Sequence, residues 1–179
     1  MKWTRALCDG LVVALLVAGC GTTTSTSVDP EDPAGADLPA GVPPNASRVE
    51  WRQIDEVTTP ISLVQDRRRL VIRNATEWSD FWSELQGAVV PTPQPPAVDF
   101  TRQVVVAATM GQQPSSGYAI EFADVFEADG TLFPVVVETS PAAGCVLTPV
   151  VTAPAVAVLI DRADLEISFV EERRTADCR

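Results

Sequence analysis

The sequence predicts a mainly β domain, a β-sandwich or barrel-like sheet of mostly antiparallel strands, with one amphipathic helix near residues 76–86. Two observations lead to this fold class. Beyond residue 48, about eight to ten short apolar segments are separated by turns rich in glycine, proline and polar residues, as in all-β domains. Apolar residues recur convincingly with the period of a helix in one stretch, at Trp78, Phe81, Trp82 and Leu85.

The first 19 residues have the order of a secretory signal peptide. Lys2 and Arg5 precede an apolar run at 11–18, which is too short to span a bilayer as a helix. The run ends in Val-Ala-Gly-Cys, which is similar to the bacterial lipobox. We therefore expect residues 1–19 to be removed and Cys20 to be lipidated, which places the protein in the bacterial cell envelope, on the extracytoplasmic side of a membrane. The alternative is an ordinary signal peptide followed by an incidental cysteine.

Residues 20–47 differ in composition from the rest of the chain. Threonine, serine, proline and acidic residues dominate here, and few side chains could be buried in a core. We expect a disordered tether between the lipidated cysteine and a single globular domain at 48–179. The whole chain has a net charge of −11, which makes nucleic acid and anionic lipid poor partners. Attachment to a membrane would then depend on the lipid anchor alone.

The domain is expected to begin with a strand at 49–57. Segments 61–64 and 70–73 are interpreted as a hairpin with its turn at 66–68. Three consecutive arginines, Arg67 to Arg69, could form a basic site, although a solvated turn is the simpler interpretation. In the helix that follows, Asn74 is the expected N-cap and Glu77 can reach back toward it, while Gly87 ends the helix.

The stretch 98–122 is interpreted as the central strand pair. Residues 104–110 are almost entirely apolar, as in a strand buried on both faces, whereas 118–123 alternate between apolar and other residues. The polar loop between these strands is the best candidate interaction surface. Its partner-binding residues are predicted to be Gly111, Gln112, Gln113, Ser115, Ser116, Gly117 and Tyr118. Tyr118 could instead serve only as the first core residue of its strand.

The C-terminal half is expected to contain a hairpin and three further strands. Asp129-Gly130 is a strong hairpin signal between 122–127 and 131–138, and Pro134 indicates an edge strand or a bulge. The further strands are expected at 146–151, 155–161 and 165–171.

Part of this region resembles a known family. Asp99-Phe100, the apolar run after it and the segment from Gly111 to Tyr118 are similar to the signature of the PrcB family, the C-terminal domain of a subunit that stabilises a secreted bacterial protease. Ser116 stands where the family pattern has the first of two glycines. The resemblance covers 76–178 and implies a non-enzymatic accessory protein whose partner is an exported protein such as a protease.

Cysteine usage fits an exported protein. With Cys8 lost in the signal peptide and Cys20 lipidated, Cys145 and Cys178 remain, and we expect them to form a disulfide. A free catalytic thiol is the alternative, but a residue next to the C-terminus is poorly placed to be preorganised as a nucleophile.

Residue types that are missing narrow the chemistry. The chain has no histidine, and its only lysine is Lys2, which excludes Ser-His and Cys-His nucleophiles and lysine Schiff bases in the processed protein. We therefore predict no catalytic residues, no metal site and no cofactor. Two alternatives remain open: a structural envelope protein, and a small hydrolase or calcium site built on carboxylates from Asp124, Glu127, Asp161, Asp164 and Glu166.

Overall fold

The computed structural model describes residues 38–87 and 89–178. The predicted signal peptide, Cys20 and most of the predicted tether lie outside the described residues. In the described part, nine strands and one helix form a sandwich of two sheets, which confirms the predicted fold class. None of the described helices has the length and hydropathy needed to cross a membrane.

Four antiparallel strands form the first sheet. Their order is β2 (Trp51–Gln53), β7 (Ala155–Ile160), β4 (Val104–Met110) and β3 (Arg67–Ile72). Strand β4 is therefore an interior strand that pairs with β3 on one side and β7 on the other. Its complete burial confirms the prediction of a strand covered on both faces.

The second sheet is mixed. Its antiparallel part contains β1 (Ser47–Arg48), β5 (Ala119–Ala128) and β6 (Thr131–Pro141). On the free side of β6, β8 (Glu166–Ile167) and β9 (Val170–Ala176) pair with it in parallel at successive positions.

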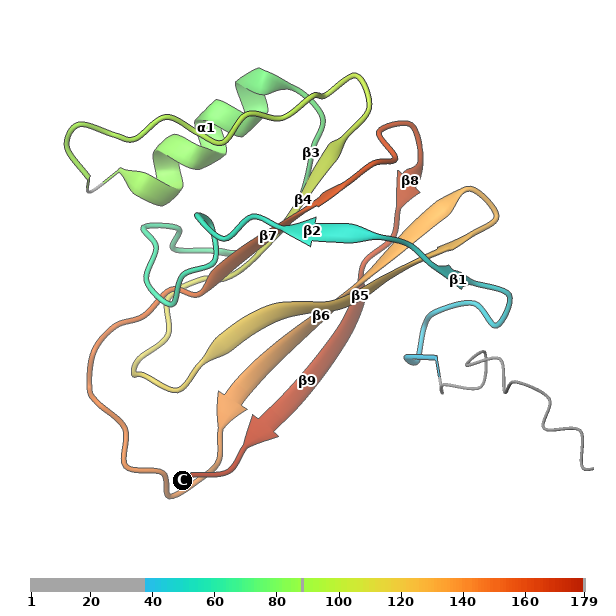
Figure 1. The fold of residues 1–179 in the computed structure, drawn as a ribbon. Coiled ribbons are helices and arrows are strands. Elements are labelled where there is room, and N and C mark those ends of the chain that lie inside the picture. Colours follow the sequence, from blue (N-terminus) through green and yellow to red (C-terminus); the bar gives the residue numbers. More distant parts are fainter. Residues whose placement is uncertain (1–37, 88, 179) are drawn as a thin grey trace, which may run out of the picture. The chain divides into compact units, whose positions relative to one another are not determined.

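Helix α1 (Ala75–Gln86) covers the outer face of the four-stranded sheet (Figure 1). Successive side chains of β4 face different layers of the domain. Val105 and Ala107 pack with the helix, whereas Val104 and Val106 pack against the second sheet. Because side chains point to opposite faces in turn, this continuous apolar run supplies two cores at once.

The helix begins where the sequence predicts. The Asn74 side chain accepts a hydrogen bond from the Glu77 amide at 2.9 Å, and the Glu77 carboxylate accepts one from the Arg73 amide at 3.1 Å. This exchange is a variant of the capping box in which the carboxylate reaches one residue beyond the N-cap.

Residues 38–46 cover the outer face of the second sheet. Val42 is buried there with Phe126, Val135 and Val170, and Leu38 and Ala46 pack against the same cluster. The boundary predicted at residue 48 is therefore too late, because the segment just before it contributes apolar side chains to a core.

Strands β4 and β5 do not pair, so the predicted central strand pair is wrong. They belong to different sheets, and the loop at 111–118 crosses from one sheet to the other. The hairpin predicted at 61–64 and 70–73 is also wrong: 61–64 is irregular, and Arg67 and Arg68 lie within β3 rather than in a turn.

The hairpin of β5 and β6 is confirmed, with positive φ angles at Asp129 and Gly130 in its turn. Pro134 indicated an edge strand or a bulge, but strand β6 is interior, and the irregularity in this pair lies in β5 between Phe122 and Asp124, opposite Val136 and Val135. Strand β8 pairs with β6 up to Leu132 and β9 pairs from Val135 onward. Pro134 falls in the interval between these partners, where a residue without an N–H group interrupts neither parallel ladder.

Candidate protein-interaction site

Three loops meet at one end of the sandwich, on the left in Figure 1. The loop at 111–118 is joined to the segment 54–66 by the Gln112 amide, which donates to the Gln65 carbonyl at 3.1 Å. It is joined to the loop at 142–154 by two hydrogen bonds between the backbones of Gln113 and Thr152, at 2.8 and 3.1 Å. The Ala153 amide completes the connection by donating to the Pro60 carbonyl at 3.0 Å. We call this region the loop end.

Gly111 is required for this arrangement. Its φ is +70°, and a Cβ atom added to it would lie 2.7 Å from the Gln65 carbonyl oxygen and 2.8 Å from the Arg67 nitrogen. A larger residue would have to displace backbone atoms, so Gly111 sets the close contact between the end of β4 and the start of β3.

Gly117 bounds the other end of the predicted loop. It has a φ of +93°, and an added Cβ would lie 3.1 Å from a methyl group of Leu147 and 3.3 Å from Pro141. Both glycines of the predicted site therefore have a conformational role.

The two serines use their hydrogen-bonding groups within the loop end. The Ser116 amide donates to the Thr148 carbonyl, and the Ser116 hydroxyl accepts from the Thr148 amide, each at 3.0 Å. The Ser115 carbonyl accepts from the Thr152 hydroxyl at 3.0 Å. Among the described residues other than glycine, only Asp129 has a positive φ, so Ser116 occupies its glycine position without strain.

The remaining members of the predicted site differ in exposure. Gln112 is exposed, and its side chain makes no hydrogen bond with the described residues. Gln113 is half-buried, and its side-chain amide donates to the Met110 carbonyl at 3.1 Å. Tyr118 is half-buried and packs against the core between the sheets. Gln112 is thus the most accessible polar side chain of the predicted set.

Exposed apolar side chains at the loop end were missed by the sequence interpretation. Among the described residues, the large apolar side chains that remain exposed are Ile61, Leu63, Val89, Val90, Val146, Val150 and Val151. Residues 61–64 and 146–151 were expected to be strands, and their apolar residues were therefore expected to be buried. Pro149, inside the second segment, is the signal that argues against a strand there.

Five of these seven residues lie in the loops of the loop end, and Val89 and Val90 follow α1. Ile61 bridges to Ala153, two residues beyond Val151, which is 60% exposed. A Leu63 methyl group lies 3.4 Å from the position of a Cβ on Gly87, at the end of α1, after which Val89 and Val90 are exposed. The loop end therefore combines apolar residues with the polar Gln112.

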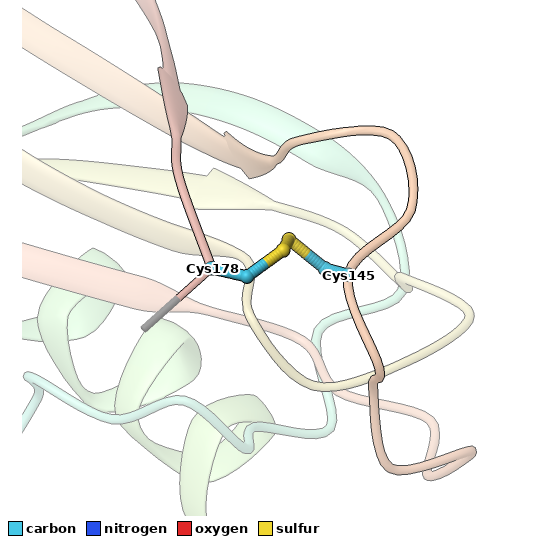
Figure 2. The surroundings of a disulfide bond; sticks show 2 residues. All are labelled: Cys145 and Cys178. Atoms are coloured by element: carbon cyan, nitrogen blue, oxygen red, sulfur yellow. A yellow bond between two sulfur atoms is a disulfide. The ribbon is translucent and has the colours of Figure 1, made fainter.

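A disulfide holds one of these loops. Cys145, in the loop after β6, is joined to Cys178, just beyond β9, with their Cα atoms 5.4 Å apart (Figure 2). The pairing is the one expected from the sequence. It fixes the beginning of the 142–154 loop to the C-terminal end of the second sheet.

Residues 104–161 match the family model described as PrcB C-terminal. The match confirms the predicted resemblance over a shorter range than expected, from β4 through β7 and the first residue after it. It includes two of the loops that form the loop end. No curated protein and no solved structure matches the chain significantly. The PrcB C-terminal family is of a non-catalytic, accessory type and is associated with a protease complex.

Three of the five carboxylates considered from the sequence have partners. Asp124 forms an ion pair with Arg48 at 2.5 Å, Glu127 lies 3.5 Å from Arg162, and Asp161 accepts a hydrogen bond from Gln103 at 2.7 Å. Asp164 and Glu166 are exposed. Within 38–87 and 89–178, no three histidine, cysteine, aspartate or glutamate residues are grouped as a metal site would require.

The consecutive arginines of β3 are divided between the two faces of their sheet. Arg68 points to the helix and binds Glu84 at 2.5 Å. Arg67 and Arg69 point the other way and bind Glu138 of β6 at 2.7 and 2.6 Å, and both also bind Glu171 of β9. Arg67 and Arg69 join the edge strand β3 to β6 and β9 of the second sheet, and the three arginines do not form the basic site that was considered.

The pKa values of this network reflect competing effects. Burial acts to raise the pKa of Glu171, but its hydrogen bonds and ion pairs with Arg69 and Arg67 outweigh burial and lower it. Burial likewise acts to lower the pKa of Arg69, and its bonds to Glu171 and Glu138 raise it overall. The charged form of each group is therefore favoured in the folded protein.

Proposed function

We propose that this chain is a lipid-anchored accessory protein without catalytic activity that binds and stabilises an exported protein, in particular a protease. The observation that carries the proposal is the position of the PrcB C-terminal match, which includes the loops at 111–118 and 142–154. The loop at 142–154 contains exposed Val146, Val150 and Val151, and the segment 54–66 contains exposed Ile61 and Leu63. Solvent-exposed apolar side chains grouped on a rigid scaffold are typical of protein interfaces.

The loop end has the composition of a docking surface. Ile61, Val150 and Val151 offer apolar contact, and Gln112 offers a donor and an acceptor near them. Strand β4, which leads into the loop at 111–118, is paired on both sides, and the hydrogen bonds between the three loops hold the surface in place. A partner would therefore meet a surface that needs little ordering on binding, which reduces the entropic cost of association.

The docking proposal is tested by site-specific crosslinking in membranes of the native organism. A photoreactive residue at Gln112 should crosslink a protease, identified by mass spectrometry, and the same residue at exposed Asp164 should not. Deletion of the protein should also shorten the lifetime of that protease. Replacing Ile61 and Val151 together with aspartate should abolish the crosslink and the protection. Equal crosslinking from Gln112 and Asp164 would contradict the proposal.

Lipid anchoring is tested separately at Cys20. Because Val-Ala-Gly-Cys follows an apolar run too short to span a bilayer, we expect Cys20→Ala to abolish labelling by a fatty-acid analogue and to leave unprocessed precursor. Labelled protein is detected after membrane fractionation. Labelling that survives the substitution would show that the anchor is elsewhere.

A further inference from the structure

Strand β3 leaves one edge of its sheet without a strand partner. It is the last strand in the order β2-β7-β4-β3 and pairs only with β4 among the described residues. An edge strand presents backbone N–H and C=O groups that another extended segment can use. At six residues, β3 is long enough to bind a short peptide in this way.

A groove runs between this strand and helix α1. Its volume is about 300 Å³, and it is lined by Arg68, Leu70, Val71, Ile72, Glu77, Asp80, Phe81 and Glu84. Ile72 and Phe81 are buried in its floor and Leu70 is half-buried. The free strand edge and an apolar floor therefore lie side by side.

The helix side of the groove is acidic. Glu77, Asp80 and Glu84 lie on successive turns of α1, and all three are exposed. Arg68 is the cation that lines the groove, and it binds Glu84 at 2.5 Å. Since Arg67 and Arg69 face the other sheet, a negative charge remains along the helix side at Glu77 and Asp80.

We propose that this groove binds an extended, basic segment of a partner protein, which adds to β3 as a further strand. Alternate side chains of the added strand would face α1. A lysine or arginine at these positions covers the apolar floor with its aliphatic stem and places its charge near Glu77 and Asp80. This surface is separate from the loop end and does not depend on the function proposed for it.

Charge excludes the two occupants that the chain itself could supply. The sequence from Gly21 to Asp37 contains four acidic residues and no arginine or lysine, so it would be repelled by the helix side of the groove. A second copy paired through β3 would bring two acidic helices together. A basic segment from another protein meets no such repulsion.

The test uses the full chain and a fluorescent seven-residue peptide in which lysine alternates with valine or threonine. We expect saturable binding by fluorescence anisotropy at low ionic strength, and no binding of the same peptide with glutamate in place of lysine. Asp80→Lys should weaken binding about fivefold or more, because an attraction becomes a repulsion. Asp164→Lys, the matched change at an exposed turn, should leave binding unchanged.

Backbone pairing is tested with two peptides that carry N-methyl groups on alternate amides, one in each register. At least one should fail to bind, since a methylated amide cannot donate to the strand edge. Four outcomes would each overturn the proposal. The first two are equal binding of the two methylated peptides and equal binding of the lysine peptide to wild type and Asp80→Lys. The others are absence of binding by the lysine peptide and a dimer paired through β3 in sedimentation. A protein with aspartate at both 61 and 151 should still bind the peptide, which separates this result from failure of the loop end.

Discussion

Glu138 lies between two guanidinium groups where β3 of the first sheet approaches β6 of the second. Its carboxylate is 2.7 Å from Arg67 Nε and 2.6 Å from Arg69 Nη2, and the side chains of Glu138 and Arg69 are 10% and 11% exposed. Glu138→Gln should lower the free energy of unfolding by about 2–3 kcal/mol, because it leaves a nearly buried cation with only Glu171 to neutralise it. Urea denaturation of the two proteins measures the difference.

A matched control is available on the neighbouring strand. Glu172 binds Arg174, which is 52% exposed, within the same strand. Glu172→Gln should therefore change stability by less than about 0.5 kcal/mol. If both substitutions cost the same, burial of the Glu138 pair is not what stabilises the contact between the sheets.

Glu171 gives the same network a dependence on pH. Its pKa in the folded protein is lowered from the ordinary value of 4.5, so the folded state favours the charged carboxylate. The stabilisation from this group should be complete above pH 4.5 and lost as the pH falls through the lowered pKa. Thermal unfolding between pH 7 and pH 3 should show a steeper loss for the wild type than for Glu171→Gln. Parallel curves would mean that Glu171 titrates alike in both states.

Among the elements, the junction of β4 with the loop at 111–118 depends on Gly111. Gly111→Ala should destabilise the domain by more than about 2 kcal/mol, because a strained positive φ is combined with contacts below 3 Å to backbone atoms. Gly130 has a φ of +77° and open space around it, so a substitution there measures the cost of the positive φ without any steric contact. Gly130→Ala should cost about 1 kcal/mol. Equal losses in the two variants would show that the close approach at Gly111 is relieved by small movements.

Elements with a complete local signal were predicted correctly. Helix α1 has its cap, its apolar period and its terminating glycine within a short stretch, and the β5–β6 hairpin is specified by Asp129-Gly130. The sheet to which each strand belongs could not be read in the same way. Strand β4 pairs with β7, far along the chain, and the apolar pattern of β4 does not identify that partner.

The candidate site was predicted only in part for a related reason. The loop at 111–118 is recognisable from its glycines and polar residues, but its hydrogen bonds go to 54–66 and 142–154. Apolar residues such as Val150 and Val151 resemble core residues in sequence. Their exposure depends on a loop that forms no strand, which periodicity alone does not show.

For the molecule as a whole, the disulfide constrains the C-terminal part of the chain. Cys145 and Cys178 are 33 residues apart, and closing a loop of this length stabilises a folded protein by roughly 3–4 kcal/mol through the unfolded state. Replacing both cysteines with serine should lower the free energy of unfolding by about this amount. Urea denaturation under oxidising conditions measures it, and the same wild-type protein after reduction is the control. Equal stability of oxidised and reduced wild type would contradict this role.

The segment between the two cysteines contains β7 of the first sheet and both β8 and β9 of the second. The covalent ring therefore passes through both layers of the sandwich. A peptidase that cuts anywhere between residues 145 and 178, for example in the exposed part of the 142–154 loop, leaves the two fragments joined by sulfur. Such a cut molecule would migrate as an intact chain in electrophoresis without reductant and as two pieces with it. A protein proposed to work beside a protease could thus be nicked at its own binding loop and remain one covalent particle.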